Sequence, residues 1–87
     1  MKFTVTWTPD AEAQLTRIWL AARDRTTLTA ATHAIEQKLG TDPANAGESR
    51  DPGRRITIEE PLAVIFRVDE TPYTVRVLRV WRTRSRP

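Results

Sequence analysis

The spacing of apolar residues changes once along the chain, and this change constrains the fold more than any other feature. Between residues 9 and 40, apolar side chains recur at three- and four-residue intervals, which is typical of helices with one buried face. Between residues 55 and 82 they alternate with polar ones, which is typical of half-buried strands. Residues 41–53 are rich in Asp, Asn, Gly, Ser and Pro, so we expect a loop there. The pattern predicts an α+β fold.

A strand and two helices are predicted before the loop. Residues 3–7 alternate between apolar and polar side chains and should form the strand. Thr8 is a candidate helix N-cap, because Pro9 follows it at the first helical position. Apolar stripes over residues 11–22 and 28–39 define two helices, which a short link joins into an antiparallel hairpin.

Three strands are predicted after the loop, one around Ile56, one around Phe66 and one from Tyr73 to Trp81. The turns between them are expected at residues 59–61 and 69–72, where Pro, Asp and Glu gather. The predicted order is β-α-α-β-β-β, an antiparallel sheet packed on an N-terminal helical hairpin.

Length and composition exclude several classes of protein. A chain of 87 residues has room for one hydrophobic core, so residues 1–87 are expected to form a single domain. It contains no Cys, which excludes disulfides and thiolate zinc sites. There is no apolar signal-peptide region, no apolar run near the roughly 20 residues of a membrane span, and no phosphate-loop or nucleophile-triad motif. We therefore expect a cytoplasmic protein without a metal ion, a cofactor or a membrane partner.

Arginine is concentrated in the second half of the chain. Residues 50–87 hold nine Arg against five Asp or Glu, whereas residues 1–49 hold five Lys or Arg against six acids. From residue 76 to residue 87 there are five Arg and no acid. Such asymmetry favours an anionic partner for the C-terminal half, either a nucleic acid or an acidic protein.

The expected turns determine which side chains share a face of the sheet. In the last hairpin we expect Val68 opposite Tyr73. In the hairpin before it, a three-residue loop would place Ile58 opposite Leu62. Guanidinium groups interleaved with apolar side chains can bind phosphates or an acidic amphipathic segment of a partner protein. With these registers, the face away from the helices carries Arg55, Arg67, Arg76 and Arg82 together with Ala63, Ile65, Leu78 and Val80.

Few side chains are suited to acid–base catalysis near neutral pH. The one histidine, His33, is expected on the solvent side of the second helix. Tyr73 is expected to pack on the helical side of the sheet, and Glu48 lies in the long loop, from which it could approach Arg82. Trp7, Trp19 and Trp81 are expected to pack in the core, and the alternative for Trp81 is a partly exposed position that meets a partner.

Three groups of residues have the order and spacing of motifs found in one family of small proteins. Residues 3–12 match an opening strand followed by a helix that starts at P-x-A. Residues 34–47 match a second helix and the loop L-x-x-x-P-x-x-G. Residues 55–56, 64–68 and 77–82 match three closing strands. Over nearly its whole length, the chain resembles the RelE/ParE superfamily of type II toxins.

The resemblance implies a small toxin that is neutralised by an antitoxin encoded next to it. RelE-like members cleave mRNA in the ribosomal A site, whereas ParE-like members inhibit DNA gyrase and are not nucleases. The RelE-like group uses basic residues of the sheet face and usually a His or Tyr near the C-terminus. In this sequence Arg82 stands at the His position of the motif V-x-H-x-R, and no Tyr stands at the C-terminal end. This departure counts against the nuclease.

We therefore expect a ParE-like toxin of a toxin–antitoxin or plasmid stabilization system. Its expected partners are DNA gyrase as the target and a cognate antitoxin, in a toxin–antitoxin hetero-oligomer. The alternative is a RelE-like endoribonuclease acting on mRNA at the ribosome, and a third hypothesis is a detoxified family member. The catalytic candidates of the alternative are Arg55, Arg67, Arg76 and Arg82. The residues expected to bind a partner or a phosphate are Arg55, Ile65, Arg67, Arg76, Leu78, Arg82 and Arg84.

Overall fold

The computed structural model describes residues 2–50 and 52–83. Its elements follow the expected order of a strand, two helices and a run of strands, which confirms the α+β fold. The structure adds a short strand within the segment expected to be a loop. The elements are β1 (Thr4–Trp7), α1 (Pro9–Ala21), α2 (Arg25–Thr41), the 3₁₀ helix η1 (Pro43–Asn45), β2 (Glu48–Arg50), β3 (Arg54–Glu59), β4 (Leu62–Glu70) and β5 (Tyr73–Arg82).

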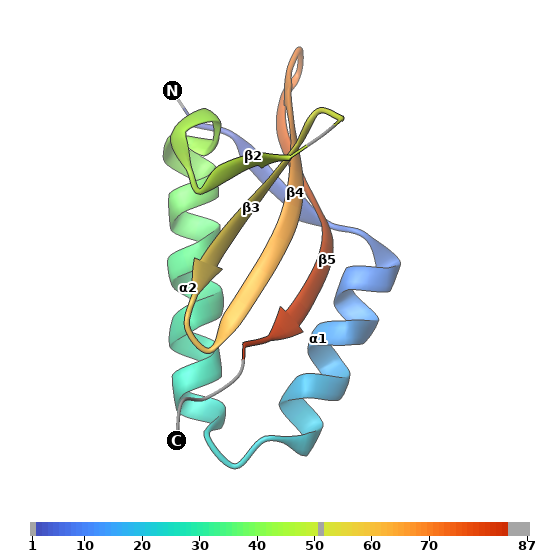
Figure 1. The fold of residues 1–87 in the computed structure, drawn as a ribbon, viewed down its shortest axis with the longest axis vertical. Helices are drawn as coiled ribbons and strands as arrows, with labels where there is room; N and C mark the ends of the chain where they lie inside the picture. Colours follow the sequence, from blue (N-terminus) through green and yellow to red (C-terminus); the bar gives the residue numbers. More distant parts are fainter. Residues whose placement is uncertain (1, 51, 84–87) are drawn as a thin grey trace.

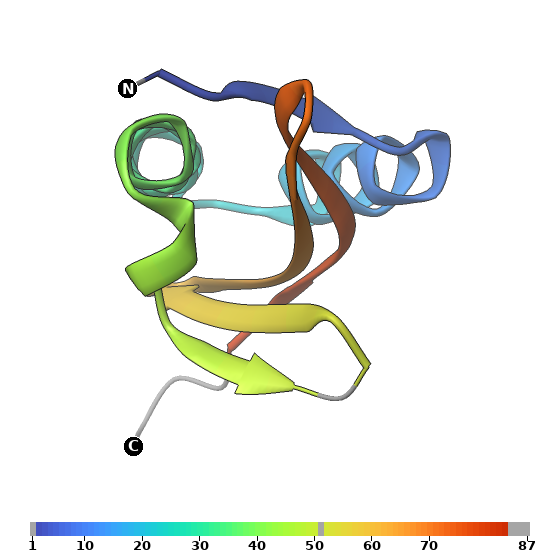
Figure 2. The ribbon, with the colours of Figure 1, turned by 90° about the horizontal axis from the view of Figure 1, so that it is seen from above.

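The five strands form one mixed sheet in the order β1-β5-β4-β3-β2. β1 runs parallel to β5, and the other neighbours are antiparallel. The two helices run in opposite directions, as expected for a helical hairpin (Figure 1). Seen from above, β1 and the β2–β3 hairpin lie on opposite sides of the molecule, with both helices between them (Figure 2). The sheet is thus strongly twisted, in keeping with the twist that side-chain sterics impose on strands.

Thr8 fixes the start of α1 in the way the sequence predicts. Its hydroxyl accepts a hydrogen bond from the Ala11 N–H at 3.1 Å, and Pro9 is the first residue of the helix. The same residue is tied to β5, because its N–H donates to the Val77 carbonyl at 3.0 Å. Its hydroxyl also donates to the Leu78 carbonyl at 3.3 Å. The helix therefore begins against the middle of β5.

The core lies between α2 and strands β4 and β5. α2 supplies a stripe of buried residues at helical spacing, as predicted, and Phe66 of β4 is the largest fully buried side chain. A buried side chain of this kind contributes about 1.5–3 kcal/mol by leaving water, so this cluster is the main source of stability. Its principal members are Leu28, Ala31, Ile35 and Leu39 of α2, with Leu62, Val64, Phe66, Val75, Val77 and Val80 of the sheet.

α1 is more exposed than its apolar stripe suggests. Ala11 is its one buried residue, while Trp19 and Leu20 are 40% and 62% exposed. The Arg25 guanidinium lies over the Trp19 ring at 4.4 Å and donates to the last carbonyls of the helix. The expectation that Trp19 packs in the core is therefore wrong.

In the described part of the chain, no helix combines the length and the apolar character that a membrane crossing needs.

The register of β3 against β4 differs from the predicted one by a single residue. Glu59 lies opposite Leu62, so the turn between them contains two residues rather than three. Because successive side chains of a strand point to opposite faces, this shift exchanges the faces of β3. Ile58 therefore points away from the helices, to the open face of the sheet, and is 58% exposed, while Thr57 is buried. Arg55 points to the helix side, so its predicted place on the open face is wrong.

The register of β4 against β5 differs from the predicted one by two residues, which leaves the faces unchanged. Val68 lies opposite Val75 rather than Tyr73. An even shift preserves the alternation of side chains along a strand. Arg67 and Arg76 therefore lie opposite each other on the open face, where they were expected.

A β-bulge in β5 reverses the faces toward the end of this strand. The pairing shifts at the middle of β4, so that Leu78 of β5 has no partner across the pair. As a result Val80 points into the core and is buried, and Arg79 points to the open face. Arg82 has the same orientation as Val80. The predictions that Val80 and Arg82 lie on the open face are wrong for this reason.

Two glycines with positive φ provide a test of the β2–β3 hairpin. Gly47 and Gly53 both have a φ of 64°, which favours glycine. A Cβ at Gly47 would lie 1.8 Å from the Ile56 carbonyl oxygen, whereas one at Gly53 would meet nothing within 4 Å. We expect Gly53→Ala to lower the free energy of unfolding by about 1–2 kcal/mol, the cost of left-handed backbone. Gly47→Ala should lower it clearly more. Equal losses in urea unfolding would contradict the close approach at Gly47.

Candidate functional site

Four arginines lie directly opposite one another across the open face. Arg50 of β2 lies opposite Arg54 of β3. Arg54 lies opposite Arg67 of β4, which in turn lies opposite Arg76 of β5. All four residues are exposed, and Thr6 of β1 continues the same line across the sheet. These four residues are the arginine row.

Apolar side chains occupy the middle of the next two lines across the open face, and the first of these lines has the exposed Glu48 at one end and the exposed Arg79 at the other. Ile56 lies opposite Ile65, and Ile58 lies opposite Ala63. Trp81 of β5 lies opposite Ala63 on its other side and is half-buried. These five residues are the apolar rows. The open face therefore combines a line of positive charge with an adjacent apolar surface.

The arginine row places like charges side by side. Neighbouring strands are about 4.8 Å apart, and like charges directly opposite each other destabilise a sheet. Among residues 2–50 and 52–83, Glu48 forms an ion pair with Arg50 of the arginine row, with 3.4 Å between Glu48 Oε2 and Arg50 Nη1. In this part of the chain, Arg54, Arg67 and Arg76 have no carboxylate within ion-pair distance. Their charge is therefore available to an anionic partner.

The expected binding residues outside the row are distributed over the fold. Arg55 supports the β2–β3 hairpin, because its Nε donates to the Ala46 carbonyl at 2.9 Å and its Nη2 to the Gly47 carbonyl at 3.0 Å. Ile65 and Leu78 are half-buried, the first on the open face and the second at the bulge. Arg84 lies outside the described residues. Of the predicted set, the structure thus brings together Arg67, Arg76 and Ile65.

On the helix side of the sheet, Arg82 binds Asp24. Its Nη1 donates to Asp24 Oδ1 at 3.0 Å and its Nη2 to Oδ2 at 2.6 Å, a two-bond geometry that matches a guanidinium to a carboxylate. These hydrogen bonds lower the pKa of Asp24, and the carboxylate raises the pKa of Arg82. The pair links the end of β5 to the residue that precedes α2.

Several residues of the open face were not found from the sequence. A two-residue turn after β3 would have identified Arg54 and the isoleucines, because it exchanges Arg54 with its neighbour Arg55. No signal placed Arg50, which lies in a segment without strand periodicity. The residues missed are Arg50, Arg54, Arg79, Ile56, Ile58 and Trp81.

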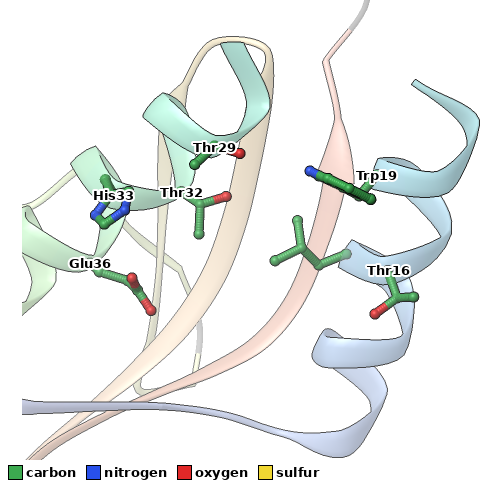
Figure 3. Close-up of a pocket in the computed structure, with 7 residues that line it drawn as sticks. Thr16, Trp19, Thr29, Thr32, His33 and Glu36 are labelled. Carbon is green, nitrogen blue, oxygen red and sulfur yellow. The ribbon is translucent and has the colours of Figure 1, made fainter. Parts of the chain in front are cut away.

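A groove with a volume of about 310 Å³ lies between the two helices (Figure 3). Leu15 and Trp19 of α1 line one side, and His33 and Glu36 of α2 line the other. Glu36 accepts a hydrogen bond from Trp7 Nε1 at 3.1 Å, so its carboxylate helps to hold β1 against α2. His33 is exposed, as expected. The groove belongs to the helices, and its side chains are not part of the arginine row.

The remaining titratable ring and the acidic groups do not complete a known type of reactive centre. Tyr73 packs edge-on against Phe3, with ring centroids 5.3 Å apart. Among the described residues, no three His, Asp or Glu side chains are grouped to hold a metal ion. The open face offers positive charge to anions and apolar side chains to apolar groups.

Comparison with protein families identifies the chain. A family model described as the ParE toxin of the type II toxin–antitoxin system parDE matches residues 5–87. The chain belongs to this toxin family. A search of curated proteins finds no match.

Solved structures of toxin–antitoxin systems are similar to this toxin. The RelBE2 toxin–antitoxin complex from Mycobacterium tuberculosis contains a chain with a TM-score of 0.76 and 24% identity, with 94% of this chain and 92% of that one covered. The chromosomal ParDE system from P. aeruginosa contains one with a TM-score of 0.68 and 26% identity, with 95% and 98% covered. TrmO from P. aeruginosa also matches, at a TM-score of 0.59 and 25% identity, but the match covers 91% of the toxin and 33% of TrmO. The RelBE2 similarity shows a shared fold.

The repulsion within the arginine row predicts that the toxin gains stability when a charge is removed. Arg67 has an arginine opposite it on both sides, so Arg67→Gln should raise the free energy of unfolding by about 0.2–1 kcal/mol. The gain should shrink at high salt, which screens exposed charges. Urea unfolding at low and high salt measures both effects. A loss of stability at low salt would show that the row is not repulsive.

The Arg82–Asp24 pair predicts a pH-dependent contribution to stability. The pKa of Asp24 is lowered in the folded toxin, so the pair stabilises the fold above the ordinary pKa of Asp and loses this effect as pH falls through the lowered value. Asp24→Asn should therefore be less stable than the wild type at neutral pH and equal to it in acid. Asp24 makes no side-chain cap to α2, so the substitution removes no cap. A stability difference that persists unchanged into acid, measured by urea unfolding, would contradict this assignment.

Proposed function

We propose that this toxin acts by binding another protein through its open face, with DNA gyrase as the target and a cognate antitoxin as the neutralising partner. The observation that carries the proposal is the arginine row beside the apolar rows. Arg and Trp side chains contribute much of the binding energy in protein interfaces, and both occur on this face. The RelBE2 and ParDE structures are of toxin–antitoxin systems, which supports an antitoxin as the partner.

The ring side chains that could serve in acid–base catalysis are located outside the open face. His33 lies on α2 and Tyr73 packs on Phe3. Arg82, at the position where the family motif V-x-H-x-R has His, is bound to Asp24. An arginine stabilises a phosphate but stays protonated, so it cannot serve as a base. These placements support a binding toxin over a nuclease.

A second candidate function is the ribosome-dependent cleavage of mRNA, and the position of Glu48 favours it. This carboxylate belongs to the open face, beside Arg50 and opposite Ile56. A general base must lie within hydrogen-bonding reach of the proton that it removes. The second candidate assigns this role to Glu48, with the phosphate of an mRNA nucleotide on the arginine row.

Induction of the toxin without its antitoxin distinguishes the two candidates. DNA supercoiling, gyrase-linked DNA breaks and mapped mRNA ends are measured in the same cells. We expect gyrase-linked breaks with intact mRNA. Cuts at fixed codon positions would contradict the proposal and support the second candidate, and normal growth with the protein present would indicate a detoxified family member.

Variants of the open face connect the activity to the arginine row. Arg67→Ala/Arg76→Ala removes two adjacent charges of the row and should abolish growth inhibition. Arg17→Ala/Arg82→Ala removes two arginines outside the open face and should leave inhibition intact. Glu48→Gln should also remain toxic, whereas the second candidate requires it to be inactive. Toxicity that survives the first double variant would exclude the open face as the working surface; circular dichroism checks that each variant folds.

A further inference from the structure

We propose that a hollow at the end of α1, away from the open face, binds a phosphate monoester. This α1 hollow has a volume of about 660 Å³, which is in the range of small-molecule sites. The inference goes beyond the proposed function and does not rest on it, since the partners of the proposed function bind the open face. The α1 hollow is lined by Arg17, Ile18, Ala21, Ala22, Arg23, Asp24 and Arg82.

The sequence at the end of α1 leaves room for a ligand. Arg17 and Ala21 are four residues apart on α1, so they share a face of the helix. Ala21 and Ala22 have short side chains at positions where a larger residue would fill the space between α1 and Arg82 at the end of β5. Together with Ile18, the two alanines give the α1 hollow an apolar floor beneath its arginines.

The α1 hollow carries a net charge of +2, because three arginines and one aspartate line it. Asp24 is neutralised there by its two hydrogen bonds to Arg82. Arg82 keeps further N–H groups for a ligand, since a guanidinium group has five. Within the described ranges, Arg17 and Arg23 have no carboxylate at ion-pair distance. Two guanidinium groups are therefore available to an anion, and Asp24 holds the third in place.

The carboxyl end of α1 does not use the arginines of the α1 hollow. Free carbonyl groups at a helix C-terminus repel anions and attract cations. Arg25, the first residue of α2, donates to the Trp19 carbonyl at 3.0 Å and to the Leu20 carbonyl at 3.1 Å. These hydrogen bonds compensate the negative end of α1 from outside the α1 hollow. The positive charge of Arg17 and Arg23 is thus left for a ligand.

A phosphate monoester matches the α1 hollow in charge and in its number of oxygen atoms. It carries nearly two negative charges at neutral pH and presents three strong acceptor oxygens. Each of the three guanidinium groups can bind such oxygens through parallel N–H···O bonds. A carboxylate offers one charge and two oxygens, so it leaves part of the positive charge unmatched. The ester group of the ligand lies on the apolar floor, where it leaves water.

A bound phosphate strengthens the part of the fold that is packed least. Ala11 is the one buried residue of α1, so the last turns of this helix are held by few apolar contacts. A ligand that binds only the folded toxin stabilises it according to its concentration. In the α1 hollow it connects α1 to the end of β5 and leaves the open face accessible.

An NMR titration of the full-length toxin tests the inference, because its signals separate the α1 hollow from the arginine row. Phenyl phosphate is the probe, at about pH 7.5, where it is a dianion. We expect saturable shifts of the amide signals of Ala21, Ala22 and Arg23. Inorganic phosphate should bind there at least about threefold more weakly, since it has no apolar surface to bury. Benzoate, which keeps the ring but has one charge, should bind at least about tenfold more weakly.

Matched variants assign the binding to the arginines of the α1 hollow. Arg17→Gln/Arg23→Gln removes two charged donors, so phenyl phosphate should bind there at least about tenfold more weakly. Arg67→Gln/Arg76→Gln makes the same change in net charge on the arginine row, and it should change this affinity by less than about twofold. Ala21→Leu keeps the charge and fills the floor, so it should also weaken binding. Circular dichroism checks that each variant folds, and the single variants replace a double variant that does not.

An affinity that is equal in the wild type and in Arg17→Gln/Arg23→Gln overturns the α1 hollow as a binding site. Shifts confined to the arginine row, or no saturable shift at all, have the same consequence. None of these results bears on growth inhibition through the open face, so the proposed function is tested separately.

Two sources of the phosphate are compared at the amide signals of the α1 hollow. Thymidine 5′-monophosphate represents a free nucleotide, and a short DNA strand with a 5′-phosphate represents the end of a nucleic acid. Tighter binding of the first supports a nucleotide as the ligand, and tighter binding of the second supports a strand end. A DNA strand that binds the α1 hollow equally well with and without its 5′-phosphate would overturn the monoester as the group recognised.

Discussion

One unpaired residue in β5 couples the docking of α1 to the composition of the open face. Leu78 has no partner in β4, and its carbonyl accepts the Thr8 hydroxyl at the start of α1. Two residues later, the Val80 N–H donates to Gln14 Oε1 of the same helix at 2.9 Å. β1 ends at Trp7 and no longer pairs with β5 beyond this point. There α1 supplies hydrogen-bond partners to the β5 backbone, as buried polar groups require. Because a bulge exchanges the faces beyond it, this contact directs Val80 into the core and Arg79 toward the open face.

The elements could be predicted from the sequence because each depends on local periodicity and on caps such as Thr8. The faces of Arg67 and Arg76 were also predictable, since an even error in register does not alter them. The faces of β3 depend on whether one turn has two residues or three, and the sequence at residues 59–61 permits both. The bulge was not predicted because an unbroken alternation was assumed through β5, which placed Arg82 with Arg76, although the consecutive apolar residues Val77 and Leu78 interrupt the pattern. The ion pair between Arg82 and Asp24 joins segments 58 residues apart in the chain, so local periodicity could not indicate it.

The arginine row opposes the stability of the chain that carries it. A row of like charges on neighbouring strands disfavours the sheet, and the Debye length of about 8 Å at physiological salt does not fully screen charges at this separation. The buried cluster around Phe66 must offset this repulsion in the free toxin. An anionic partner reverses the sign of the effect, because each guanidinium group then gains an attraction and its neighbours repel it less. Such a trade of stability for function is expected at a working surface.

The proposed function requires no change of conformation in the toxin, only competition of two partners for one face. Long-range charge mainly raises the rate at which partners associate, so the arginine row favours association with any acidic protein. Residence time is governed by the contacts made after docking, where affinities of related complexes differ most. On the open face these contacts are made by the apolar rows. Within the proposed function, Ile58, largely exposed at the edge of those rows, is the position at which these contacts can be altered without a change in the charge of the open face.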